Sequence, residues 1–347
     1  MNRHEQGMRV ESSQEGERKP RLEIMITRHA NRTPTGELTP EGVQAMRDKG
    51  RSLAETAEIV KGRSSREKTD RAFKTVDSMS AESGTVSPLT GEHYSARRRE
   101  GLYYDVAGPL ISRIRKESQM INVAIRKDFP DYDLTKSAWA KVREKYESIG
   151  IENTVNDPEL MHIMAMGVAN NVRQAEKTGV EYVRKRTDAV TSKKQSALAI
   201  EKDVILPIGT HSGFSEAFIK KTLIRKTFDG ERRGFDTTVD DDGNAHMEKA
   251  VGGIFAPTES IRFGHEVGES TPDRMPVTFE NNRFEGEGTF IDNQAVAKLA
   301  EQYQTYRDLL DRWNRKEVSE QDFEKELGAL MQEYAEWENN KSADVAS

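Results

Sequence analysis

A chain of 347 residues with 53 Lys and Arg against 59 Asp and Glu, a net charge of −6, lacks the strongly basic character that general nucleic-acid binding requires. It has no cysteine, which excludes disulfide bonds, thiolate zinc sites and a cysteine nucleophile. No run of about 18 apolar residues predicts a transmembrane helix, and the polar N-terminus lacks the apolar segment of a secretory signal, so we expect a soluble, cytoplasmic protein.

The first third of the chain predicts one strand and two helices. LEIMIT (22–27) is a short, apolar, β-branched run that is typical of a buried strand. It follows a polar tail, residues 1–20, which we expect to be disordered. A threonine followed by a first-turn proline favours a helix over 39–60. A second helix is predicted over 68–80 and contains Arg71.

The rest of the chain predicts a second buried strand, then antiparallel strands and helices. VILPIGT (204–210) is apolar like the first strand, and a helix is expected from Ser215 to Lys226. Residues 227–292 favour antiparallel strands, with a hairpin turn at 240–244. These elements predict an α/β fold, with a central, mainly parallel sheet and helices on both faces. The predicted segments are an α/β core at 21–110 and 200–292, a helical insertion at 111–199, a C-terminal helical extension at 293–340 and a tail at 341–347.

Both apolar strands lead into a histidine: LEIMIT is followed by Arg28 and His29, and VILPIGT by His211. Ligands of open α/β sheets bind beyond the carboxyl ends of the strands, so His29 and His211 meet there if the two strands are neighbours. Arg28 and Arg32 would join them, and the N-terminus of a following helix would add a positive field. Because guanidinium groups match phosphate oxygens in bidentate geometry, these residues predict a phosphate pocket.

Four motifs, in the same order, resemble those of the histidine phosphatase superfamily, which includes phosphoglycerate mutase-like and histidine acid phosphatase-like proteins. RHANRTP (28–34) is similar to the family's RHGxRxP signature, with Ala30 in place of glycine, and LTPEGVQAMRDKG is similar to the helix that follows it. A backbone N–H at Ala30 can still point at the phosphate, so this departure is mild. TDRAFKT (69–75) resembles the second-arginine segment, and THSG (210–213) resembles the late-histidine segment. The resemblance covers residues 22–110 and 200–225.

The resemblance implies a phosphoglycerate mutase-like fold and a role for each matching residue. His29 would be the nucleophile and would pass through a phosphohistidine. Arg28, Arg32, Arg71 and His211 would hold the phosphoryl oxygens. These roles agree with the charge argument, because positioning and electrostatic stabilisation carry most of the catalysis of phosphoryl transfer. No cofactor is implied, and the spacing of the remaining histidines predicts no metal site.

The acid that protonates the leaving oxygen is left open by the sequence. Ser212 follows His211 where the acid-phosphatase and phytase branch has an aspartate, and serine is no acid at neutral pH. The phosphoglycerate mutase-like branch takes its acid from a glutamate after the second arginine. In the corresponding segment of this chain, Asp105 and Glu100 are both candidates, and Glu92 is a third.

These observations predict a phosphomonoester hydrolase that acts on a phosphorylated small molecule or protein. Two alternatives remain: a catalytically weak phosphate-recognition or regulatory protein, favoured by the missing His-Asp pair, and a phosphoglycerate-type mutase, which must protect its phosphohistidine from water. The basic run 97–99 suggests a rim that attracts phosphorylated substrate. The C-terminal helices offer a surface for oligomerisation, and neither nucleic acid nor a membrane is expected as a partner.

Overall fold

The computed structural model describes residues 19–31, 37–65, 70–85, 92–102, 104–113, 123, 127, 149–193, 199–241, 244–281, 283–285 and 287–346, with the backbone alone at 65, 104, 105, 193 and 342–346. Three predicted features lie outside these residues, in whole or in part. They are the tail up to residue 18, Arg32, and most of the stretch 114–148 within the predicted insertion 111–199. In chain order, the elements are β1 (Arg21–Arg28), α1 (Pro40–Thr56), β2 (Ala57–Ile59), β3 (Arg63–Ser65), α2 (Arg71–Glu82), β4 (Arg97–Arg99), the 3-10 helix η1 (Tyr104–Leu110), α5 (Pro158–Lys193), β5 (Asp203–Thr210), α6 (Phe214–Thr222), β6 (Leu223–Thr227), β7 (Gly230–Arg233), β8 (Thr237–Val239), β9 (Ala245–Met247), the 3-10 helix η3 (Lys249–Val251), β10 (Ser260–Glu266), β11 (Arg274–Phe279), β12 (Gly288–Asp292), α7 (Asn293–Asn314) and α8 (Glu320–Ala346).

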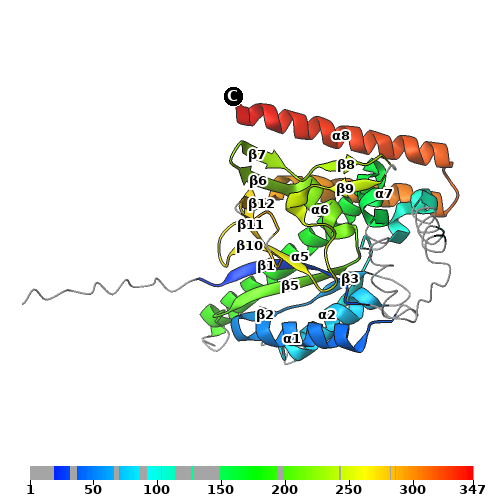
Figure 1. Ribbon diagram of the computed structural model, residues 1–347. Helices are drawn as coiled ribbons and strands as arrows, with labels where there is room; N and C mark the ends of the chain where they lie inside the picture. The colour runs from blue at the N-terminus through cyan, green and yellow to red at the C-terminus, as the bar shows by residue number, and fades with distance from the viewer. Residues whose placement is uncertain are drawn as a thin grey trace, which may run out of the picture.

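The main sheet has a parallel half and an antiparallel half (Figure 1). Its strand order is β4-β3-β5-β1-β10-β11-β12-β6-β7, and β2 pairs with β5 beside this path. Within β4-β3-β5-β1 and β2 every pairing is parallel, whereas every pairing from β1–β10 to β6–β7 is antiparallel. The α/β class with a parallel core, predicted from the sequence, is therefore confirmed.

Helices cover both faces of the parallel half. Successive side chains of its strands point to opposite faces, so each face carries apolar residues that a helix layer buries. On one face, Met25 of β1 and Ile205 of β5 pack with Met46 of α1 and Met79 of α2. On the other face, the neighbouring apolar side chains join the larger core that α5 and α6 cover (Figure 1). The strand residues of that larger core are Leu22, Ile24, Ile26, Val204, Leu206 and Ile208.

Two predicted helices end early because a strand takes over. The helix expected over 39–60 ends at Thr56, and the residues after it form β2 on β5. The helix expected to reach Lys226 ends at Thr222, and the residues after it pair with β12 as β6. In both places a hydrogen-bonding neighbour from elsewhere in the chain overrides the local helical pattern.

The C-terminal part places α7 along α5 and α8 across the end of the molecule (Figure 1). Asp292 begins α7, because its carboxylate accepts hydrogen bonds from the backbone N–H groups of Gln294 and Ala295. The second helix of this pair, α8, continues to Ala346, so the tail expected from 341 is helical. The predicted antiparallel hairpin at 240–244 connects β8 and β9, which pair with Thr238 opposite His246.

Among the described helices, none combines the length and the apolar character that crossing a membrane would require. The predicted division into core, insertion and extension stays a prediction.

Candidate functional site

The two histidines that follow the apolar strands lie side by side. Arg28 at the end of β1 pairs in register with Thr210 at the end of β5, so both strands stop at the same level. The backbone N–H of His29 then donates to the Thr210 carbonyl at 3.0 Å. The rings of His29 and His211 meet edge to face with their centroids 5.0 Å apart, and the two residues are only 6% and 2% exposed. The predicted convergence of these histidines is confirmed.

The imidazole of His29 is held in one orientation by its own chain. Its Nδ1 lies 2.8 Å from the carbonyl oxygen of Ala30. A carbonyl oxygen only accepts hydrogen bonds, so Nδ1 carries the proton and donates it there. In the neutral ring this leaves the lone pair on Nε2, which is the atom that can attack phosphorus or accept a hydrogen bond.

The surroundings of His29 keep this ring neutral. Burial lowers the pKa of His29 well below its ordinary value, and the nearby His211, Arg71 and Arg28 lower it further. The hydrogen bond to Ala30 acts in the opposite direction but is outweighed. The site therefore combines a neutral imidazole with a positive field, which suits a negatively charged ligand.

Arg28 is positioned by the segment between η3 and β10. Its guanidinium donates to the carbonyl of Phe255. Its backbone N–H donates to the Glu259 carbonyl at 3.1 Å, and its own carbonyl accepts from the Thr258 N–H at 3.3 Å. Because the side chain and the backbone are both held, the direction of this cation is set before any ligand arrives.

Arg71 is brought to the site by α2, which begins with this residue. The helix can approach β5 closely because Gly209 has no side chain: a Cβ there would lie 2.7 Å from the Ala72 carbonyl oxygen and 2.7 Å from a methyl group of Val76. Arg71 acts on the pKa of His29 from this position. The sequence motif therefore predicted the correct neighbour for the histidine.

Thr75 connects α2 to the turn after β1. Its hydroxyl donates to the Arg71 carbonyl at 2.8 Å and accepts from the Ala30 N–H at 3.1 Å. The Ala30 N–H is therefore bonded to a helix on the α1–α2 face. The threonine in TDRAFKT was visible in the sequence, but its partner lies 45 residues away.

Glu216 is a site residue that sequence reasoning missed. It is fully buried in the first turn of α6, where one carboxylate oxygen accepts from the Gly213 N–H and the other from the Phe255 N–H, both at 2.8 Å. Burial raises the pKa of Glu216, whereas the Phe255 N–H and Arg28 oppose this increase. Glu216 thereby holds Phe255, the residue whose carbonyl orients Arg28. A glutamate three residues after the glycine of THSG is a helix-capping signal that could have revealed it.

A second missed feature is the buried ion pair of Arg283 and Glu259, which closes the segment that orients Arg28. Both residues are at least nine-tenths buried, and the guanidinium bonds to both carboxylate oxygens. Arg283 also donates to the carbonyls of Gly253 and Ile254. These two residues lie 24 positions apart in an irregular region, and no local pattern marks the pair.

The remaining predicted site residues are placed less completely. Arg32 lies outside the described residues, as does the side chain of Asp105, whose backbone belongs to η1. Glu100 follows β4, and its half-exposed carboxylate forms an ion pair with Arg307 of α7 at 3.1 Å. In the part of the chain that the structure describes, no three His, Asp or Glu side chains are grouped to hold a metal ion.

Comparisons with known proteins give structural neighbours only. No family model matches the chain, and no curated protein matches it. Among solved structures, a phytase of Klebsiella sp. ASR1 is similar at 13% identity and a TM-score of 0.32, over 82% of this chain and 95% of the phytase. A Hafnia alvei phytase in complex with myo-inositol hexakis sulphate is similar at 10% identity and a TM-score of 0.31, over 82% and 96%.

A mycobacterial glucosyl-3-phosphoglycerate phosphatase is similar at 13% identity and a TM-score of 0.24, over 65% of this chain and 97% of the phosphatase. Two of these proteins are thus phytases and the third is a phosphatase. Likeness at these identities and TM-scores carries no argument about activity, so the residues of the site have to carry it.

Proposed function

We propose that this protein is a phosphomonoester hydrolase that uses His29 as a covalent nucleophile. The observation that carries the proposal is the orientation of His29: a buried, neutral imidazole whose Nδ1 is bonded to Ala30, within the positive field of Arg71 and Arg28. In the first step, Nε2 forms a bond to phosphorus while the bond from phosphorus to the ester oxygen breaks, and the leaving oxygen takes a proton from an acid. Water then attacks phosphorus, which releases phosphate and restores the free imidazole.

The charge balance of the site supports this chemistry. A phosphate dianion entering the pocket gains the attraction of Arg28 and Arg71 in surroundings where water screens it weakly. Since those cations are held by the fold, they do not have to reorganise during the reaction. His211, whose ring meets that of His29, is the further donor in reach of the same oxygens.

Two carboxyl groups remain the candidate acids. Asp105 belongs to η1, and Glu100 lies in the turn before it. The carboxylate of Glu100 is engaged by Arg307 of α7, so Asp105 is the stronger candidate.

The first experiment measures hydrolysis of p-nitrophenyl phosphate between pH 4 and 8 by the wild type, by His29→Ala and by His246→Ala. The control histidine is half-exposed and lies on the β8–β9 hairpin. We expect His29→Ala to lose roughly 10³-fold or more of the turnover and His246→Ala to keep it. The wild type mixed rapidly with substrate should also carry an acid-labile, alkali-stable phosphoryl group that His29→Ala lacks.

A second pair of variants identifies the acid. Asp105→Asn and Glu100→Gln are compared on p-nitrophenyl phosphate, whose leaving group needs no proton, and on an alkyl phosphate, whose leaving group does. The variant of the true acid loses roughly 10²-fold or more on the alkyl ester and little on the aryl ester. Absence of turnover in the wild type, together with a melting temperature raised by vanadate, would replace the hydrolase with a phosphate-recognition protein.

A further inference from the structure

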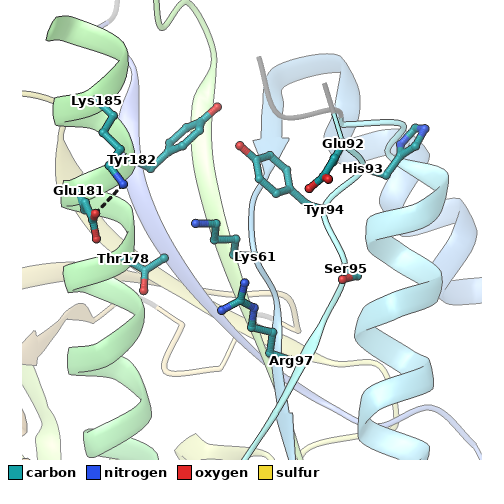
Figure 2. A pocket seen from close by; sticks show the side chains of 10 residues that line it. All are labelled: Lys61, Glu92, His93, Tyr94, Ser95, Arg97, Thr178, Glu181, Tyr182 and Lys185. Atoms are coloured by element: carbon teal, nitrogen blue, oxygen red, sulfur yellow. Dashed lines mark ion pairs between the residues drawn. The ribbon is translucent and has the colours of Figure 1, made fainter. Parts of the chain in front are cut away.

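A pocket lies between α5 and the segment that leads into β4. It has a volume of about 390 Å³, within the range of small-molecule sites. Figure 2 shows Lys61 and Arg97 in its centre, with the rings of Tyr94 and Tyr182 beside them. Thr178 and Lys185 contribute from α5.

This pocket is separate from the histidine site. β3 pairs with β5 so that Arg63 lies opposite Ile208. Lys61, two residues earlier, is therefore roughly level with Leu206, five residues before His211. That offset corresponds to about 16 Å along the strand at about 3.3 Å per residue. The pocket thus lies at the amino side of β3 and β4, whereas the histidines lie beyond the carboxyl ends.

The central cations of the pocket are not neutralised by ion pairs. Lys185 at the wall forms one with Glu181 at 2.6 Å. Lys61 and Arg97 have no carboxylate at ion-pair distance among the residues that the structure describes, although Lys61 contributes to the field at Glu181. Two converging cations on one side of a cavity favour a ligand with two negative charges.

A buried arginine beneath the pocket adds to this positive field. Arg63 is 6% exposed and donates to the side chain and the carbonyl of Gln174 and to the hydroxyl of Thr178, at 2.8–3.1 Å. All of these acceptors are neutral. Burial and, after it, the charges of Arg99 and Arg97 together lower the pKa of Arg63 to about 10. An anion in the pocket would relieve this repulsion among like charges.

The two tyrosines provide a surface for the carbon skeleton of a ligand. Their rings meet edge to face, with centroids 6.0 Å apart and an angle of 82° between the planes. The Tyr182 hydroxyl is fixed because it donates to Glu58 at 2.7 Å. Rings that are fixed before binding contribute contact area at little cost in conformational entropy.

We propose that this pocket is a second ligand site, which binds a small organic phosphate. The phosphate lies between Lys61 and Arg97, and the carbon skeleton lies against Tyr94 and Tyr182. The site is independent of the chemistry proposed for His29. Its ligand is bound without being hydrolysed there, since the histidine of the lining, His93, lies at the edge of the pocket and away from the two cations in the centre (Figure 2).

The test counts bound phenylphosphonate by isothermal titration calorimetry at pH 8. This probe has a phosphonate dianion and a ring, and its P–C bond resists hydrolysis. We expect Lys61→Gln/Arg97→Gln to bind one phosphonate fewer than the wild type. The matched control is Lys177→Gln/Arg184→Gln, which removes the same two residue types from exposed positions of α5 and should bind as the wild type does.

The count also separates this proposal from the hydrolase. Arg71→Gln should lose the phosphonate of the histidine site and keep that of the pocket. If the histidine site binds none, the wild type binds one and Lys61→Gln/Arg97→Gln binds none. An equal count in the wild type and that double variant overturns the proposal.

A second probe tests the role assigned to the rings. Methylphosphonate, which has the charge without the ring, should bind the pocket at least about threefold more weakly than phenylphosphonate. Equal affinity would overturn the assignment of the tyrosines.

Discussion

Buried arginines in the two halves of the sheet are balanced in opposite ways. Arg225 of β6 is 1% exposed and bonds to the carboxylates of Glu248 and Glu287 at 2.6–2.9 Å, and these carboxylates raise its pKa. Arg63 of β3 is buried almost as well, but it donates to the neutral oxygens of Gln174 and Thr178. Arg225 is thus neutralised within the packing of the antiparallel half, whereas Arg63 keeps its charge beneath a pocket where an anion can meet it.

The histidines repeat this contrast. Burial and nearby cations lower the pKa of His29 in the parallel half. On the β8–β9 hairpin, Asp240 and then Glu152 raise the pKa of His246. His29 in the parallel half is thus surrounded by cations, which favour an anionic ligand. His246 on the hairpin is instead paired with carboxylates of the chain itself.

Removing Arg225 should have the largest effect on stability. Arg225→Met leaves two partly buried carboxylates without their cation, so we expect the free energy of unfolding to fall by about 3 kcal/mol. Urea denaturation measures the loss, and turnover per folded molecule should be unchanged. A loss below about 1 kcal/mol would contradict the difference that we infer between Arg225 and Arg63.

Thr75→Val tests the neutral hydrogen bonds of the parallel half. It leaves the buried Ala30 N–H without its acceptor, which should cost about 1–3 kcal/mol of stability and reduce turnover because the turn carrying His29 loosens. Thr191→Val is the matched control, since the Thr191 hydroxyl makes the same bond to the carbonyl four residues earlier but is exposed. Equal effects of the two variants would show that the contact with Ala30 is unimportant.

The lowered pKa of His29 predicts acid sensitivity. Below pH 6.5, His29 binds a proton in the unfolded chain but stays neutral in the folded site. The contribution of His29 to stability is therefore present above pH 6.5 and is lost as the pH falls. The loss is at most about 1.4 kcal/mol per pH unit for this residue. His162, whose pKa burial lowers to about 3, has the same sign.

The measurement is the free energy of unfolding between pH 7 and 5. His29→Gln should show a shallower decline than the wild type. His246→Gln should change the curve in the opposite sense, because a raised pKa gives stability that is present at low pH and lost as the pH rises. Parallel curves for the wild type and His29→Gln would contradict the neutral, buried state of this ring.

Arg63→Met should have the smallest effect. It removes a buried cation and leaves no carboxylate unpaired, so we expect a change in stability within about 1 kcal/mol of zero, far below that of Arg225→Met. Thermal unfolding of both variants side by side checks the ratio. Destabilisation by Arg63→Met as large as that by Arg225→Met would mean that Arg63 has a structural charge partner.

Much of the site could be predicted because its chemistry lies at strand ends. The apolar runs before His29 and His211 predicted two buried strands. The order of the motifs indicated which residues would lie beside the two histidines. Arg71 was recognised by its motif, and α2 brings it to the histidine. The ends of α1 and α6 were not predictable in the same way, since β2 and β6 exist only where a partner strand is present.

Local sequence by itself determined which residues end the two strands, and therefore that an imidazole and a guanidinium follow a buried β1. Only the tertiary structure decided that β5, some 180 positions later by the register of Arg28 with Thr210, lies beside it. Only the tertiary structure gave the Ala30 N–H to Thr75 and the Phe255 N–H to Glu216. The physical reason is that a strand's apolar pattern is written in consecutive residues, whereas each of these hydrogen bonds joins groups that only the packing of distant segments brings together.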